Sequence, residues 1–263
     1  MKLAANLTLL YPGLPLEERI ALAERDGFEG VEILFPYDIT PRTLHGLLKR
    51  HGLTLALINT PPGPGGEKGL ACLPGREEEF RRAMQAALDI CQETGCRIVH
   101  AMAGMPGRNA DRHACRRTLV ENLRLAAPLA AKAGVALTLE ALNRLDMPGY
   151  FYYLPEQAVD IIREVGEDAV RLQFDLYHCQ REGLDLVSTL HAVWPWVRHV
   201  QFAHPQGRHE PDLSDPQVKA ALRWLVCEGY AGWVGCEYVP REDARSGLAW
   251  RSSYDALLRK ERS

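Results

Sequence analysis

The feature that most constrains the fold of this chain is a regular alternation of short apolar runs with longer amphipathic segments. Eight runs have the length and composition of buried strands, and a segment with helical spacing of apolar residues follows each one. The expected strands are Leu3–Leu9, Gly30–Leu34, Thr54–Asn59, Arg97–Met102, Val135–Glu140, Val170–Asp175, Val197–Phe202 and Gly232–Glu237. The expected helices are Leu16–Asp26, Pro41–His51, Arg76–Thr94, Asp111–Ala133, Pro155–Val165, Leu184–Val193, Asp215–Glu228 and Arg241–Arg259.

Eight strand–helix pairs with no change in composition along the chain predict one α/β domain, a (β/α)8 TIM barrel over residues 1–263. The length suits this fold, which typically takes about 250 residues, and its active sites lie at the carboxyl ends of the strands. An open doubly wound sheet is the alternative. The Gly-rich fingerprint of that fold is missing after the first strand.

The bulk composition excludes several classes of partner. A net charge of -3 and a pI near 6.3 give no electrostatic reason to expect nucleic acid or an anionic membrane. No apolar run approaches 18 residues, so no membrane span is expected, and Leu3–Leu10 is too short and polar for a secretion signal. Seven cysteines without a Cys-x-x-Cys pair fit reduced thiols in a cytoplasmic protein. The composition does not decide whether the chain forms a homo-oligomer.

Four of the expected strands carry an oxygen-bearing side chain at, or one residue before, their carboxyl end: Glu140, Asp175, Gln201 and Glu237. Adjacent strands of a barrel lie about 4.8 Å apart, so these side chains can reach one ion. Three unpaired carboxylates in a partly buried mouth would raise one another's pKa, and a divalent cation removes that cost. An all-oxygen ligand set favours Mg²⁺ or Mn²⁺ over zinc. The alternative is four unrelated polar groups bonded to loop backbone.

Glu140 and Glu237, on the fifth and eighth strands, are expected to face each other across a bound ligand. Two opposed carboxylates can take a proton from one carbon and return it to the neighbouring carbon through an enediolate. That chemistry is aldose–ketose isomerisation or epimerisation. Asn143 and Asp146 follow Glu140 in the same loop and could line the same pocket.

Other candidates have competing explanations. His178, in the loop expected after the sixth strand, could reach a substrate hydroxyl or carbonyl oxygen. Arg208 could clamp a carboxylate because its guanidinium offers paired donors, or it could pair with Glu210. His100 and His199 lie inside strands, where core packing competes with a role as ligands. The Pro- and Gly-rich segment 60–75, which follows the third strand, is expected to close over the pocket as a lid.

Several segments carry a family resemblance. They are Ala4-Ala5-Asn6-Leu7-Thr8, Val31-Glu32 with Phe35-Pro36-Tyr37-Asp38, Gly66-Glu67-Lys68-Gly69-Leu70-Ala71-Cys72, Pro74-Gly75-Arg76-Glu77, Glu121-Asn122-Leu123-Arg124, Asp146-Met147-Pro148-Gly149, Asp175-Leu176-Tyr177-His178, Arg208-His209-Glu210-Pro211 and Gly232-Trp233-Val234-Gly235-Cys236-Glu237-Tyr238. Through them the chain resembles the hydroxypyruvate isomerase family, within the xylose-isomerase-like TIM barrel superfamily. The resemblance covers nearly the whole length.

The resemblance implies isomerisation of hydroxypyruvate to tartronate semialdehyde (2-hydroxy-3-oxopropanoate), a small hydroxy-keto acid. Similar relatives isomerise 2-oxo-tetronates, and ketose 3-epimerases and inositol-pathway dehydratases share the scaffold. It also implies that Glu140 and Glu237 exchange protons with the substrate. The metal would be bound by four strand-end residues, Glu140, Asp175, Gln201 and Glu237. His178 and Arg208 would contact substrate oxygens.

Two segments depart from the family pattern near the substrate face. Val239-Pro240 stands where the family often has Lys-Pro, and residues 212–216 replace a common Gly-Glu-Ile-Asn-Tyr. The sequence therefore does not distinguish between hydroxypyruvate, a 2-oxo-tetronate and a neutral ketose as the substrate. Two alternative functions belong to other classes of protein. One is a repair nuclease with a barrel fold, which needs a histidine-rich trinuclear zinc site and a basic groove. The other is a non-catalytic protein that binds sugar acids.

Overall fold

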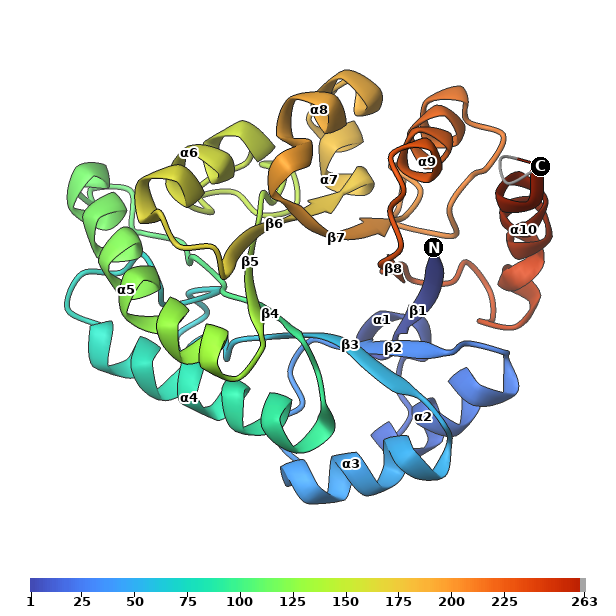
Figure 1. The fold of residues 1–263 in the computed structure, drawn as a ribbon, viewed down its shortest axis with the longest axis horizontal. Helices are drawn as coiled ribbons and strands as arrows, with labels where there is room; N and C mark the ends of the chain where they lie inside the picture. The colour runs from blue at the N-terminus through green and yellow to red at the C-terminus, as the bar shows by residue number, and fades with distance from the viewer. Residues whose placement is uncertain (261–263) are drawn as a thin grey trace.

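A computed structural model describes residues 1–260 of the chain as a closed barrel of eight parallel strands in sequential order (Figure 1). The strands are β1 (Lys2–Asn6), β2 (Gly30–Ile33), β3 (Thr54–Asn59), β4 (Ile98–His100), β5 (Ala136–Glu140), β6 (Val170–Asp175), β7 (Val197–Phe202) and β8 (Trp233–Cys236). The predicted (β/α)8 fold is confirmed. Parallel order with every strand next to its sequence neighbours brings all the carboxyl ends to one rim.

The helices form a ring around the barrel (Figure 1). They are α1 (Leu7–Leu10), α2 (Leu16–Arg25), α3 (Pro41–Arg50), α4 (Glu77–Thr94), α5 (Arg112–Lys132), α6 (Pro155–Val165), α7 (Leu176–Arg181), α8 (Leu186–Val193), α9 (Pro216–Cys227) and α10 (Arg251–Lys260), with 3₁₀ turns η1 (Trp194–Trp196) and η2 (Ser246–Trp250). No helix within residues 1–260 is both long enough and apolar enough to cross a membrane.

Helix ends fall where the sequence places capping residues. Thr40, Asp111 and Asp215 each accept a backbone N–H from the first turn of the helix that follows, which satisfies a donor that the helix itself cannot use. Gly95 and Gly166 end α4 and α6 with φ of 78° and 75°, a conformation that costs a glycine little. Local chemistry therefore sets most boundaries.

Two predicted boundaries next to strands are wrong for one shared reason. The strand expected over Leu3–Leu9 stops at Asn6, whose Oδ1 accepts the Thr8 N–H at 3.2 Å and starts α1. The loop expected after the sixth strand is helix α7, because Asp175 Oδ1 accepts the Tyr177 N–H at 2.8 Å. In both places a side chain at the strand end caps a helix at once, so the chain turns without a loop.

The last helix is also shorter than predicted. The expected helix Arg241–Arg259 begins only at Arg251, after the turn η2. Asp243 accepts the backbone N–H groups of Arg245 and Ser246 at 2.9 and 3.0 Å. These side chain–backbone bonds compete with helix formation and hold the segment in turns.

The segment 60–75 is only partly free to move. Ala71 and Cys72 are buried, and their N–H groups donate to the carbonyls of Met102 and Ala103 at 3.4 and 2.8 Å. Gly69 has φ of 126°, and a Cβ there would lie 2.3 Å from the Met102 carbonyl oxygen. Glu67 is tied as well, since its carbonyl accepts the Met105 N–H at 2.7 Å. The second half is thus held by the chain after β4, and closure of the segment 60–75 as a lid stays a prediction.

Candidate active site

The carboxyl ends of β5 to β8 place the four predicted metal ligands around one rim. Glu140 and Asp175 are the last residues of β5 and β6, and Gln201 pairs in register with Asp175 on β7. Glu237 follows β8 directly, two residues beyond the partner of Gln201. All four side chains belong to buried residues. Since residues two apart share a face of a strand, these side chains point into the barrel mouth.

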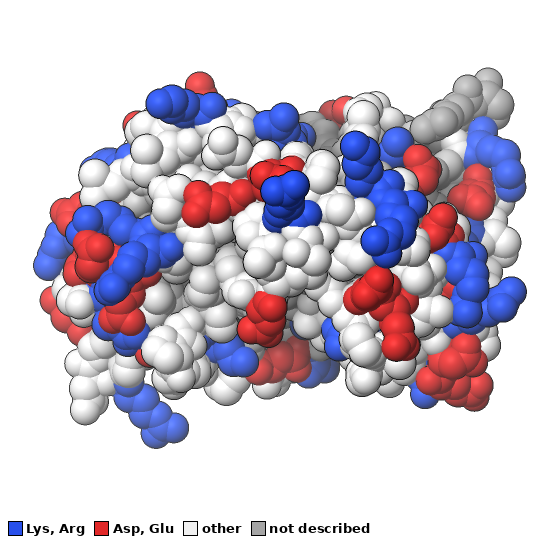
Figure 2. Space-filling model, turned by 90° about the horizontal axis from the view of Figure 1, so that it is seen from below, with Lys and Arg blue, Asp and Glu red and all other residues white. Residues whose placement is uncertain are grey.

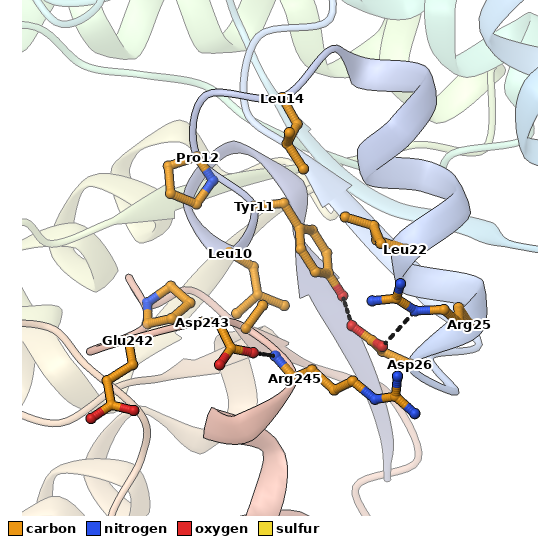
Figure 3. A pocket seen from close by; sticks show the side chains of 12 residues that line it. Leu10, Tyr11, Pro12, Leu14, Leu22, Arg25, Asp26, Glu242, Asp243 and Arg245 are labelled. Atoms are coloured by element: carbon orange, nitrogen blue, oxygen red, sulfur yellow. Dashed lines mark hydrogen bonds and ion pairs between the residues drawn. The ribbon is translucent and has the colours of Figure 1, made fainter.

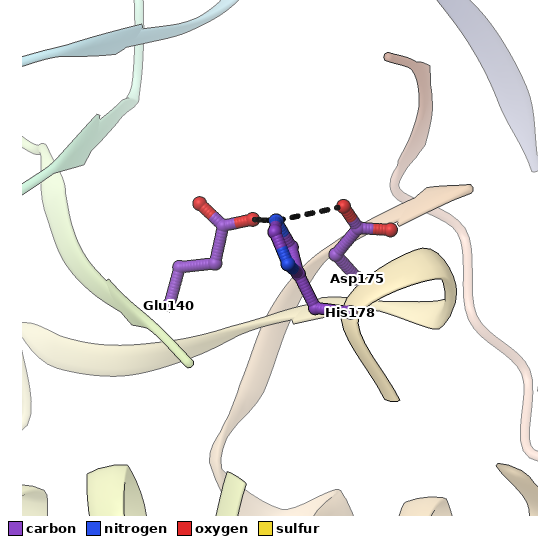
Figure 4. A group of neighbouring side chains, drawn as sticks. All are labelled: Glu140, Asp175 and His178. Carbon is purple, nitrogen blue, oxygen red and sulfur yellow. Dashed lines mark ion pairs between the residues drawn. The ribbon is translucent and has the colours of Figure 1, made fainter. Parts of the chain in front are cut away.

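Glu140, Asp175 and His178 form a buried group that could hold a metal ion (Figure 4). One potential ligand atom from each lies within 4.8 Å of the others. His178 Nε2 is 3.7 Å from both Glu140 Oε1 and Asp175 Oδ2, and these two buried oxygens have no hydrogen-bond partner. A buried carboxylate oxygen without a donor costs free energy, which a bound cation offsets. The donor set therefore fits a divalent metal.

The carboxyl groups of the rim are short of positive charge. Burial, followed by the charges of Glu237 and Asp175, raises the pKa of Glu140 well above its ordinary value. Burial raises the pKa of Glu237 to about 8, although Arg208 opposes the shift. Burial raises the pKa of Asp175 to about 6, again against Arg208. One arginine does not balance three buried acids, so the site favours a further cation.

Arg208 reaches into this group of acids from the loop after β7. Its Nη2 lies 3.0 Å from Glu237 Oε1 and 3.6 Å from Asp175 Oδ2, and its guanidinium lies 4.7 Å from the ring centre of Tyr177. Its backbone φ of 53° is unusual for a residue with a side chain. Such strain is typical of functional sites, where surrounding contacts hold it. Glu210, the alternative partner from the sequence, accepts the Arg241 backbone N–H at 3.1 Å.

A second layer of buried polar residues supports the rim, and two of its members, Gln173 and Glu32, had no role predicted from the sequence. Gln173 Nε2 donates to Glu140 Oε2 at 2.9 Å and to Gln201 Oε1 at 2.7 Å. Gln201 Nε2 donates to Glu32 Oε2 at 2.9 Å, and Glu32 Oε1 lies 2.5 Å from His199 Nε2. Hydrogen bonds thus cross the barrel from β5 to β2. The signal in the sequence was the position of Gln173, two residues before a strand-end acid and on the same face.

This layer also explains why position 235 is a glycine, and it bears on the predicted role of Gln201 as a metal ligand. A Cβ on Gly235 would lie 2.1 Å from Glu32 Oε1, so this position has no room for a larger residue. Gln201 uses both of its polar atoms within the layer. Its Oε1 accepts one hydrogen bond and keeps a second lone pair. Metal ligation by Gln201 therefore stays a prediction.

His100 lies on the wall of the site. Its Nδ1 is 3.3 Å from Glu140 Oε2, and burial lowers its pKa to about 3. His199, the other histidine inside a strand, bonds to Glu32 below the rim. Neither histidine belongs to the buried group of Glu140, Asp175 and His178.

Within residues 1–260, no second group of three or more His, Cys, Asp or Glu side chains is arranged to hold a metal ion. Figure 2 shows acidic and basic side chains interleaved on the face that it presents, without a basic groove. A hollow of about 330 Å³ lies between the segment that follows β1 and the chain after β8 (Figure 3). Its Asp26 accepts from the Tyr11 hydroxyl at 3.0 Å and from Arg25 at 3.3 Å. The hollow contains none of the predicted site residues.

Known proteins that are similar to this chain point to one family. The sequence profile of the family described as xylose isomerase-like TIM barrel matches residues 20–254. A Cupriavidus necator protein named 2-oxo-tetronate isomerase is 41% identical over 96% of this chain and 98% of its own length. An Escherichia coli K12 protein named hydroxypyruvate isomerase is 34% identical over 97% of this chain and 99% of its own.

A solved structure matches the fold closely. A Brucella melitensis protein, described as an AP endonuclease of family 2, superposes with a TM-score of 0.92 and 42% identity. The match covers 97% of this chain and 99% of that one. A trinuclear zinc nuclease needs several metal-binding groups. Within residues 1–260, one group of three or more His, Cys, Asp or Glu side chains is so arranged, that of Glu140, Asp175 and His178.

Proposed function

Because the chain belongs to the xylose isomerase-like TIM barrel family, we propose that it is a metal-assisted isomerase of a small hydroxy-keto acid. The reaction is an aldose–ketose interconversion, with hydroxypyruvate to tartronate semialdehyde as the leading candidate. The names of the relatives support this class of substrate. The observation that carries the proposal is the pair of buried glutamates at the rim, Glu140 and Glu237, whose pKa values are raised.

The proposed chemistry needs two groups that exchange protons. In hydroxypyruvate a proton leaves C3 and another arrives at C2, while the hydroxyl proton moves from the oxygen on C3 to the oxygen on C2. Glu140 and Glu237 are the groups that accept and return the carbon-bound protons. Burial raises the pKa of Glu237 and a bound cation would lower it again, so the two together can bring this carboxyl near neutral pH, where it can accept and return a proton.

Two other residues are proposed to bind the substrate. Arg208 presents paired donors beside Glu237, which suits the carboxylate of a keto acid. His178 lies buried between Glu140 and Asp175, where its Nε2 can meet a hydroxyl or carbonyl oxygen. A neutral ketose lacks the carboxylate that Arg208 would hold, so this arrangement favours an acid over a neutral sugar.

The metal is proposed to be Mg²⁺ or Mn²⁺, held by oxygen atoms of Glu140, Asp175, Gln201 and Glu237. When bound, such an ion polarises a carbonyl and stabilises negative charge on oxygen. The unpartnered oxygens of Glu140 and Asp175 support this assignment.

The test is a substrate comparison on purified protein with Mg²⁺ or Mn²⁺. Hydroxypyruvate, 2-oxo-tetronates, neutral ketoses and a DNA duplex with an abasic site are supplied separately, and products are followed by ¹H NMR or by strand cleavage. We expect turnover of a hydroxy-keto acid. Faster turnover of 2-oxo-tetronates would refine the substrate, epimerised ketoses would indicate a 3-epimerase, and cleaved DNA would contradict the proposal.

A further inference from the structure

The two ring nitrogens of His178 have different surroundings. Nε2 faces Glu140 and Asp175, whereas Nδ1 faces Asn143 in the loop after β5. The backbone N–H of Asn143 donates to Nδ1 at 3.1 Å, and Asn143 Nδ2 lies 2.7 Å from the same nitrogen. A backbone N–H is always a donor, so Nδ1 must supply a lone pair.

The orientation of the Asn143 amide is fixed independently. Its Oδ1 accepts the backbone N–H groups of Leu145 and Asp146 at 3.1 and 3.0 Å. Its other atom therefore has to be the NH₂ group, which donates to Asp146 Oδ2 at 2.8 Å as well as facing His178. Two donors converge on Nδ1 of His178, and this nitrogen carries no proton.

Asp146 is held in place as the acceptor behind Asn143. It accepts a short hydrogen bond from the Tyr177 hydroxyl at 2.5 Å and lies 3.4 Å from Arg181 Nη2. Burial alone would raise the pKa of Asp146, but the hydrogen bonds from Tyr177 and Asn143 hold it below its ordinary value. An ionised Asp146 can only accept, so it keeps the amide of Asn143 turned with its NH₂ inward.

We propose that Asn143 is a positioning residue that fixes His178 as the neutral Nε2–H tautomer. His178 then donates a hydrogen bond to a substrate oxygen above Glu140 and Asp175. An Nε2 that carries a proton has no lone pair for a metal, so His178 is not a ligand despite its place in the buried group. The remaining ligands must come from other rim residues, which favours Gln201 and Glu237. The identity of the acceptor rests on the proposed function, whereas the tautomer does not.

Nitrogen NMR of the imidazole ring tests the tautomer directly. Two-bond ¹H–¹⁵N spectra are recorded on the metal-free protein and on protein saturated with Mg²⁺, and His178→Gln identifies the His178 signals. We expect an unprotonated Nδ1 and a protonated Nε2 in both samples. A proton on Nδ1, or an Nε2 that loses its proton when Mg²⁺ binds, would overturn the proposal.

A single substitution tests the role of Asn143. Asn143→Asp keeps an oxygen for the Leu145 and Asp146 N–H groups but replaces the donor that faces His178 with an acceptor. The new carboxylate is the nearer and stronger partner and competes with the backbone N–H for Nδ1. We expect it to draw a proton onto Nδ1 and turnover to fall by about 10- to 100-fold, the range for partners that orient a site residue. An unchanged spectrum with normal turnover would contradict the positioning role.

Two further variants guard this experiment. Asn143→Ser removes the NH₂ donor without adding a charge and keeps the backbone N–H, so His178 should stay in the Nε2–H form with a smaller loss of rate. Asn109→Asp makes the same chemical change at an exposed position and should alter neither readout. If wild-type protein has the expected spectrum but isomerises none of the substrates, the proposed function fails and the tautomer assignment stands.

Discussion

Two buried glutamates of the barrel interior are chemically alike and structurally opposite. Glu32, on β2, has partners at both oxygens: His199 Nε2 at 2.5 Å from Oε1, and the amides of Asn6 and Gln201 at 3.1 and 2.9 Å from Oε2. Glu140, on β5, accepts from Gln173 at Oε2, while its Oε1 has no hydrogen-bond partner. One carboxylate is saturated by the protein and the other is left open.

The difference indicates what each carboxylate is for. A buried charge that the protein itself satisfies organises the structure around it, as Glu32 does for Gln201. A buried carboxylate oxygen without a donor leaves a free-energy cost that a proton or a bound cation can reduce. Gln201 and Gln173 link the two glutamates through hydrogen bonds, so the layer around Glu32 holds Glu140 in place.

The largest expected effect is on catalysis at the open glutamate. Glu140→Gln keeps an oxygen that can bind metal but removes a proton acceptor, and kcat should fall on the order of 10² or more. Stability of the metal-free protein should not fall, since the change removes an acid that burial disfavours. Rate and metal occupancy are measured together. A variant that keeps its metal and near-normal turnover would show that Glu140 moves no proton.

The same substitution at the saturated glutamate should act mainly on folding. Glu32→Gln replaces a charged acceptor of His199 with an amide, and the free energy of unfolding should drop by about 1–3 kcal/mol. Urea denaturation of both variants, without metal, gives the comparison. Equal stability of the Glu32 and Glu140 variants would remove the distinction between the two layers.

Another effect on stability is expected in its pH dependence when no metal is bound. Burial raises the folded pKa of Glu237 from 4.5 to about 8. Between these values the folded state keeps a proton that the unfolded state has released. This contribution to stability is therefore fully present below 4.5 and is lost as pH rises through about 8.

Urea unfolding in a chelator at several pH values across this window measures the loss. Glu237→Gln should reduce the dependence without abolishing it, because the pKa values of Glu140 and Asp175 are raised as well. Saturating Mg²⁺ should restore stability near the upper end, because the cation binds the ionised carboxylates. Metal-free stability that instead increases across the window, in wild type but not in Glu237→Gln, would reverse the predicted sign.

The smallest effect concerns the segment 60–75, which lies outside both glutamate layers. Residues 61–66 make no backbone hydrogen bond to the chain after β4, unlike Glu67, Ala71 and Cys72, so protease cleavage should be concentrated in them. Addition of a substrate or analogue should slow this cleavage if the residues close over the pocket. An equal rate of cleavage at saturation would count against a lid.

The sequence by itself determined the barrel and much of the rim. Strand and helix periodicities are local, and capping residues such as Thr40 and Asp111 act within one turn, so both can be read without partners. The placement of Glu140 and Asp175 at strand ends followed from the same pattern. The immediate helix after Asp175 escaped prediction because one residue both ends a strand and caps a helix.

Only the tertiary structure decided what each polar side chain contacts. Gln201 and Glu32 are 169 residues apart in the chain and hydrogen-bond inside the barrel, and Asn143 meets His178 across 35 residues. Closure of the sheet brings such residues together, and no local periodicity encodes the pairing. Whether a buried carboxylate is saturated or open, and which nitrogen of a histidine holds its proton, depends on these distant donors and acceptors.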